Sequence, residues 1–176
     1  MIKALRFGEK RSFVREARAL GKVRGTEGLQ HLEAVVLDGR DLKIVSRYAG
    51  PTLRHCLARD LLSSKHLDDV HEQVLAGLQR MHQAGVTHGD LHPENVCVTM
   101  GSTRLHAAII DMGFSTFRGE PSFKKEKQKD MDDFAFLLKE TTELFRGSSG
   151  SSDADEDELD WEDRFASDGE EEGEKP

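Results

Sequence analysis

The chain has 176 residues, a net charge of −8 at pH 7, and hydrophobic and charged fractions of 36% and 33%. This length accommodates one ordinary domain, and because no run of eighteen apolar residues occurs, we expect no membrane span. Residues 148–176 contain thirteen acidic and two basic side chains, which leaves about +3 for residues 1–147. A mildly basic body suits an anionic ligand such as a nucleotide and does not by itself indicate nucleic acid.

The compartment is predicted from two absences. The first ten residues lack the apolar core and cleavage site of a secretory signal. The two cysteines, Cys56 and Cys97, have neither metal-binding nor redox spacing. We therefore expect a reduced intracellular location, cytoplasmic or nuclear.

The first fifty residues predict a small sheet with one helix. Residues 1–7 alternate apolar and polar side chains as a strand does, and residues 13–20 carry one apolar helical stripe. Residues 31–37 and 42–45 flank an Asp-Gly turn and predict a β-hairpin. Gly50-Pro51 then ends the strand pattern.

The remainder predicts mainly helices. Residues 67–84 form the clearest helix, because apolar side chains recur every three or four positions until Gly85 stops the run. A short helix is expected over residues 52–62 and two short strands over residues 96–99 and 105–110. Another helix is expected over residues 130–145, with an apolar face of Phe134, Leu137, Leu138 and Leu144.

Two stretches carry the chemistry: residues 88–98 read HGDLHPENVCV and residues 109–113 read IIDMG. Asp90 stands five residues before Asn95, and Asp111 follows sixteen residues after that amide, at the end of a strand-like run. A carboxylate that orients a hydroxyl, with an amide and a carboxylate that hold metal, is the set that phosphoryl transfer requires. We predict Asp90 as the catalytic residue, and Asn95 and Asp111 as ligands of Mg²⁺ and of nucleotide phosphate.

These stretches resemble the catalytic and metal-binding loops of the protein-kinase-like superfamily. The resemblance implies an α+β, bilobal fold in which residues 1–50 form an incomplete N-lobe, a small antiparallel sheet plus one helix. Residues 51–147 would form a truncated, mainly helical C-lobe. It also implies ATP and Mg²⁺ as cofactors, and transfer of the ATP γ-phosphate to a hydroxyl of the serine/threonine type.

The resemblance assigns further residues to nucleotide binding. Lys3, in MIKAL, is similar to the lysine that contacts the α- and β-phosphates, and Glu16 would be its ion-pair partner; plain surface charge is the alternative for both. Adenine would bond the backbone near Arg47, Tyr48 and Ala49, in the segment that joins the lobes.

Other positions of the family pattern leave alternatives open. His88 resembles the histidine that opens the loop, for which a structural role is implied. Asp132 resembles an aspartate that braces the loop from a C-lobe helix, although Asp130 or Asp133 also fits.

Two departures concern the substrate. Gly89 replaces an arginine and His92 replaces a lysine of the serine/threonine protein kinases, as in the aminoglycoside and choline phosphotransferases. A small-molecule kinase is therefore the alternative to a protein kinase.

The ends of the chain suggest a third interpretation. No GxGxxG phosphate loop and no A-P-E sequence is present, so a fragment or an inactive pseudokinase that acts as a binding module is also considered. We expect residues 148–176 to form a disordered acidic tail. Trp161 and Phe165, four residues apart among carboxylates, suggest docking of this tail on a basic protein partner.

Overall fold

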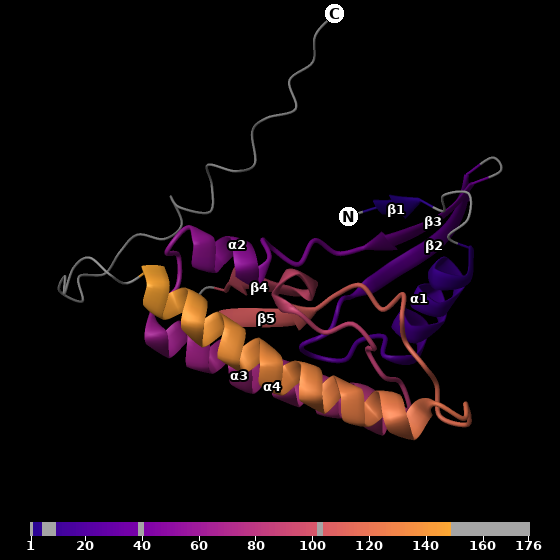
Figure 1. The fold of residues 1–176 in the computed structure, drawn as a ribbon. Helices are drawn as coiled ribbons and strands as arrows, with labels where there is room; N and C mark the ends of the chain where they lie inside the picture. The colour runs from indigo at the N-terminus through magenta and orange to yellow at the C-terminus, as the bar shows by residue number, and fades with distance from the viewer. Residues whose placement is uncertain (1, 5–9, 39–40, 102–103, 149–176) are drawn as a thin grey trace, which may run out of the picture.

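The computed structural model describes residues 2–4, 10–38, 41–101 and 104–148. A small sheet with one helix lies at one end of the molecule, and two long helices lie beneath a two-stranded hairpin (Figure 1). The elements, in chain order, are β1 (Ile2–Ala4), α1 (Lys10–Lys22), β2 (Leu32–Asp38), β3 (Asp41–Ser46), α2 (Leu53–Ala58), α3 (Ser64–Gln83), the 3-10 turn η1 (Pro93–Asn95), β4 (Val96–Met100), β5 (Leu105–Ile109) and α4 (Phe123–Ser148).

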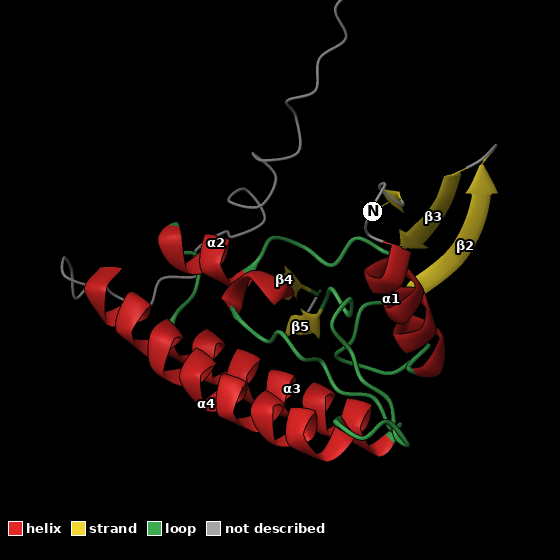
Figure 2. Cartoon of the chain, turned by 45° about the vertical axis from the view of Figure 1, so that its right-hand side comes forward, coloured by secondary structure: helices red, strands yellow, loops and turns green. Residues whose placement is uncertain are grey.

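The N-terminal part is an antiparallel sheet of order β1-β3-β2, with α1 packed beside it (Figure 2). Lys3 lies opposite Ile44, and Leu37 lies opposite Leu42. In the apolar stripe of α1, Phe13 and Leu20 are buried and Ala17 is partly buried, as its periodicity predicts. The expected strand, helix and hairpin are thus confirmed, although residues 5–7 and the turn at residues 39–40 lie outside the described residues.

The C-terminal part is mainly helical. α3 and α4 run side by side, and the hairpin of β4 and β5 covers α3 (Figure 2). The predicted stripe of α3 is buried, and the helix ends at Gln83, with Ala84 as its C-cap before Gly85, whose φ of +75° suits a glycine. None of the helices in the described ranges is long and apolar enough to cross a membrane.

Two sequence predictions need correction here. α4 begins at Phe123, seven residues before the expected start, because residues 124–129 are all polar, are mostly exposed and show no apolar period. Leu144 is 37% exposed, whereas Thr141 is fully buried. The Thr141 hydroxyl donates to the Leu137 carbonyl and bonds His71, so the buried face of α4 includes a polar group that the apolar pattern did not indicate.

A short parallel pairing joins the two parts. Leu29 bridges Ile109, the Ile109 amide donates to the Gly28 carbonyl at 3.0 Å, and the Gln30 amide donates to the Ile109 carbonyl at 2.9 Å. From the other side, the Gln73 side chain on α3 bonds the Leu105 carbonyl and the Ala107 amide. The end of β5 is therefore fixed relative to both parts of the fold.

We expect Gly50→Ala to destabilise the protein more than Gly119→Ala. Both glycines have positive φ, +92° and +101°, so each alanine costs about 1–2 kcal/mol of backbone strain. At Gly50 the added Cβ lies 2.2 Å from the Val98 carbonyl oxygen, whereas at Gly119 nothing lies within 4 Å. Overpacking adds about 1–3 kcal/mol at Gly50 alone. Urea unfolding of both variants measures the difference, and equal losses would contradict it.

Candidate active site

The backbone of the loop that carries Asp90 is held by hydrogen bonds to a buried carboxylate of α4. Asp130 is fully buried, and its oxygens accept from the backbone amides of His88 at 2.9 Å and Gly89 at 2.7 Å. The ring of His82, on α3, bonds the same carboxylate at 2.7 Å. Hydrogen bonds to a carboxylate offset the cost of burying it. Of the three aspartates considered from the sequence, Asp130 is therefore the brace, and the preference for Asp132 is wrong.

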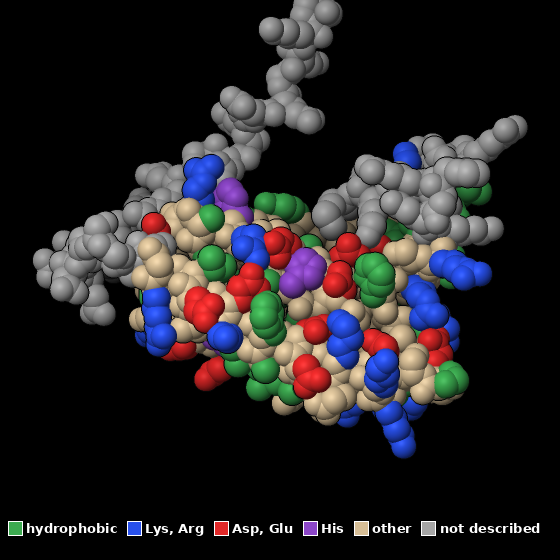
Figure 3. Space-filling view, in the orientation of Figure 1, with side chains coloured by type: hydrophobic (Ala, Val, Ile, Leu, Met, Phe, Trp, Pro, Cys, Tyr) green, Lys and Arg blue, Asp and Glu red, His purple; other side chains and the backbone are tan. Residues whose placement is uncertain are grey.

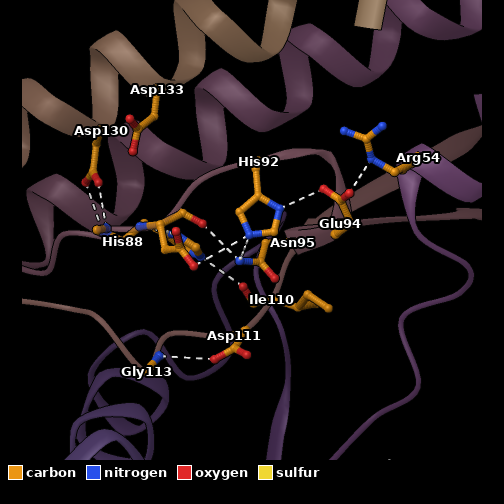
Figure 4. A network of polar contacts seen from close by, with 12 residues as sticks. Arg54, His88, His92, Glu94, Asn95, Ile110, Asp111, Gly113, Asp130 and Asp133 are labelled. Carbon is orange, nitrogen blue, oxygen red and sulfur yellow. Dashed lines mark hydrogen bonds and ion pairs between the residues drawn. The ribbon is translucent and has the colours of Figure 1, made fainter. Parts of the chain in front are cut away.

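His88 is a structural link between the two chemical loops. Its Nε2–H donates to the Ile110 carbonyl at 2.9 Å, while its Nδ1 accepts from the Asp90 amide at 3.2 Å (Figure 4). A ring nitrogen that accepts carries no proton, so the imidazole is neutral. Burial lowers the pKa of His88, against the opposite effects of the Ile110 hydrogen bond and the nearby carboxylates, and this keeps the ring neutral.

Gly89 is required by space and by backbone geometry. Its φ is +85°, and an added Cβ would lie 2.6 Å from the carbonyl oxygen of Phe114. The segment after Asp111 thus crosses the catalytic loop at a place where no side chain fits. The missing arginine noted in the sequence has this steric explanation.

Asp90 and Asn95 are held together within the loop. The side-chain Nδ2 of Asn95 donates to the Asp90 carbonyl at 2.9 Å and to Nε2 of His92 at 2.9 Å. The side chain of Asp90 is 47% exposed, so its carboxylate is accessible from solvent.

On the face drawn in Figure 3, acidic, basic and histidine side chains mix in the middle, and Lys and Arg gather toward the right.

Asp111 lies in a turn that its own side chain helps to close. Its φ is +57°, in the left-handed region, which aspartate tolerates better than most residues. Its carboxylate accepts from the Gly113 amide at 3.3 Å, and its own amide donates to Oε1 of Gln30 at 3.3 Å. The pairing of Gln30 with β5 thereby positions the turn.

The oxygen donors of Asn95 and Asp111 have the chemistry that Mg²⁺ prefers. Carboxylate oxygens and the amide oxygen of Asn95 are the hard ligands that this ion prefers. In the described ranges, no three His, Cys, Asp or Glu side chains gather closely enough to hold a metal. Asn95 and Asp111 therefore suit an ion whose remaining ligands are phosphate oxygens and water.

The predicted phosphate-binding pair is described only in part. β1 places Lys3 on the sheet, opposite Ile44, but its side chain lies outside the described residues. Glu16 is 2% exposed on the inner face of α1, so surface charge does not describe it. Pairing of the two stays a prediction.

The predicted adenine segment does connect the two parts of the fold. Arg47 follows β3 directly, but its amide donates to the His31 carbonyl at 3.0 Å and its guanidinium pairs with Glu33, so that amide is already used. Tyr48 is 70% exposed and Ala49 is half-buried. The assignment of adenine to Arg47, Tyr48 and Ala49 stays a prediction.

Sequence reasoning missed several residues that shape the site. Gln30 is buried, and besides Asp111 it bonds the Ser46 hydroxyl at 3.0 Å. Lys129 donates to the Gly89 carbonyl at 2.9 Å and pairs with Asp133 at 2.6 Å. A lone glutamine and one lysine in a lysine-rich stretch give no signal in the sequence, because their partners lie far away along the chain.

Asp130→Asn should lower the free energy of unfolding by about 3–5 kcal/mol, because one side-chain oxygen is replaced by an amide that cannot accept from the backbone. Asp132→Asn is the matched control, since Asp132 is exposed and its side chain bonds only Gln128 among the described residues; we expect a change within about 0.5 kcal/mol. Urea unfolding checks both. A larger loss for Asp132→Asn would return the bracing role to that residue.

Stability should also depend on pH through His88. Its folded pKa lies below its unfolded value of about 6.5, so the unfolded chain binds more protons, and stability present above pH 6.5 is lost as the pH falls. The slope is at most about 1.4 kcal/mol per pH unit. His88→Gln, which does not titrate, should show a shallower fall between pH 7.5 and 5.5 in urea unfolding. Identical slopes of unfolding free energy against pH for the wild type and His88→Gln would show that His88 does not cause the pH dependence.

Comparison with known proteins identifies the family. The model of the protein kinase domain matches residues 2–134. The serine/threonine-protein kinase dkf-1 of Caenorhabditis elegans is 33% identical over 85 residues, which are 47% of this chain and 12% of that protein. The death-associated protein kinase dapk-1 of the same organism is 31% identical over 104 residues, 57% of this chain and 7% of that protein.

A longer match is to the serine/threonine-protein kinase nekl-2 of Caenorhabditis elegans, 29% identical over 125 residues, 65% of this chain and 34% of that protein. The chain thus spans about a third or less of the length of these relatives. The family model nevertheless covers well over half of the chain and includes both chemical loops. The protein belongs to the protein kinase domain family.

Proposed function

We propose that this chain is an ATP- and Mg²⁺-dependent phosphotransferase that moves the γ-phosphate of ATP to a hydroxyl group. The observation that carries the proposal is the loop geometry around Asp90. The loop backbone is fixed by Asp130, its amide Asn95 is fixed by two hydrogen bonds, and the carboxylate of Asp90 stays exposed. A fixed backbone with one accessible carboxylate is what orientation of an acceptor requires.

Each residue has a separate task. Asp90 would accept the hydrogen bond of the acceptor hydroxyl and aim its oxygen at the phosphorus, with base strength secondary. Asn95 and Asp111 would hold Mg²⁺, which neutralises phosphate charge when it is bound. His88 keeps the two loops in register, since it joins the Asp90 amide to the Ile110 carbonyl next to Asp111.

The acceptor class is proposed to be a serine or threonine hydroxyl, supported by the relatives' printed names. A small-molecule hydroxyl is the second candidate, and one observation favours it. Nine residues separate Gly113 from α4, and the first of them, Phe114, lies against Gly89. So short a segment offers little surface on which to seat a polypeptide.

The acceptor class is tested by incubating the full chain with labelled ATP and Mg²⁺, against a generic protein substrate and against aminoglycosides and choline. Transfer to protein alone supports the first candidate, and transfer to a small molecule alone supports the second. A thermal-shift measurement with MgATP accompanies the assay. No stabilisation at millimolar nucleotide, together with no transfer, would favour a binding module instead, because a ligand of the folded state must raise its melting temperature.

Asp90→Asn should reduce phosphoryl transfer at least about 100-fold, because the amide no longer orients the acceptor through a charged oxygen. The thermal shift with MgATP should persist, since Asp90 is not a proposed metal ligand. Asp111→Asn should instead abolish most of that shift. Asp69→Asn, on the exposed face of α3, serves as the control. Full transfer by the Asp90 variant would remove the catalytic assignment.

A further inference from the structure

The side chain of His92 lies between the proposed catalytic and metal-binding residues. Its Nδ1 is 2.8 Å from a carboxylate oxygen of Glu94, and its Nε2 is 2.9 Å from Nδ2 of Asn95 (Figure 4). The same Nε2 is 3.5 Å from a carboxylate oxygen of Asp90, beyond a good hydrogen bond. His92 thus contacts Asn95 directly and Asp90 only loosely.

These partners determine where the imidazole carries its proton. The Nδ2 group of Asn95 only donates, so Nε2 of His92 must present its lone pair. The carboxylate of Glu94 only accepts when ionised, so Nδ1 must carry the hydrogen. These two contacts select the Nδ1–H tautomer of the ring.

The same contact determines the orientation of the Asn95 amide. One Nδ2 hydrogen goes to the Asp90 carbonyl and the other to Nε2 of His92, both at 2.9 Å. Turning the amide over would set Oδ1 against a carbonyl oxygen and against a ring lone pair, which is two repulsive contacts. With both hydrogens engaged, Oδ1 faces away from Asp90 and His92.

Glu94 is itself held by residues of two helices. Arg54, on α2, pairs with Glu94 and also with Glu140 of α4. The acceptor of the His92 proton is therefore a carboxylate anchored to both sides of the C-terminal part.

We propose that His92 is a positioning residue that fixes the Asn95 amide with its oxygen toward the metal, and that Glu94 and Arg54 hold His92 in the tautomer that this requires. The metal part of this inference rests on the proposed function. A lysine at position 92 only donates and is not able to accept from Asn95. The proposed role of His92 therefore differs from that of a lysine directed at the transferred phosphate, because His92 accepts a hydrogen bond from Asn95.

Two substitutions of His92 distinguish the role of Nε2 from the role of Nδ1. In His92→Gln the side-chain oxygen reaches the place of Nε2 and still accepts from Asn95. In His92→Asn the shorter side chain reaches only the place of Nδ1, next to Glu94, and the acceptor for Asn95 is lost. His106→Asn, an exposed histidine of β5, is the matched control.

The readout is the Mg²⁺ concentration that half-saturates the ATP-dependent thermal shift of the full chain. We expect about a 10-fold increase for His92→Asn, in the range that outer-shell partners of metal ligands contribute, and values near wild type for the Gln and control variants. Equal increases for Gln and Asn, or none for either, would overturn the acceptor role. The acceptor role would also be overturned if His92→Asn lowered the melting temperature in the absence of Mg²⁺ but left the half-saturating Mg²⁺ concentration unchanged.

A second measurement does not require nucleotide. The ¹⁵N shifts of His92 in the ligand-free chain should show a protonated Nδ1 and an unprotonated Nε2, and the Asn95 amide signals should move in His92→Asn. A protonated Nε2 would overturn the positioning role. If the wild type shows this tautomer but binds no MgATP, the proposed function fails while the hydrogen-bond relay stands.

Discussion

The carboxylate of Asp130 is the group on which the candidate site depends. It is fully buried, and it accepts from two successive amides of the catalytic loop and bonds His82. An unsatisfied buried carboxylate would cost several kcal/mol, so these partners are as necessary to Asp130 as it is to them. Through this group, α3 and α4 determine the position of a loop that has no regular secondary structure before Pro93.

The second constraint is the position of the end of β5, because this strand leads directly to Asp111, the proposed metal ligand. Gly28 to Gln30 pair with Ile109, and Gln30 then accepts from the Asp111 amide. Asp111 has a left-handed backbone, which costs about 1–3 kcal/mol for such a residue and persists only where the surroundings determine it. The N-terminal part therefore helps to hold the turn of Asp111, the proposed metal ligand, as well as carrying the predicted phosphate-binding lysine.

Hydrogen-bond saturation connects these constraints to function. His88, His92 and Asn95 are surrounded by partners that leave few alternative tautomers or amide orientations. Preorganised polar groups avoid reorganisation during the reaction. The carboxylate of Asp90 stays outside this saturated network and is about half exposed to solvent.

The α3 helix, the strands, and the grouping of Asp90, Asn95 and Asp111 could be predicted from the sequence, because these features depend on local periodicity and on short loops. Only the tertiary structure decided that Asp130 rather than Asp132 is buried, since successive helical residues turn by about 100° and only one faces a loop some forty residues earlier. Gln30, Lys129 and the Arg54–Glu94 pair were equally beyond sequence patterns. Their roles come from partners that the folded chain brings together, and no spacing along the chain records such contacts.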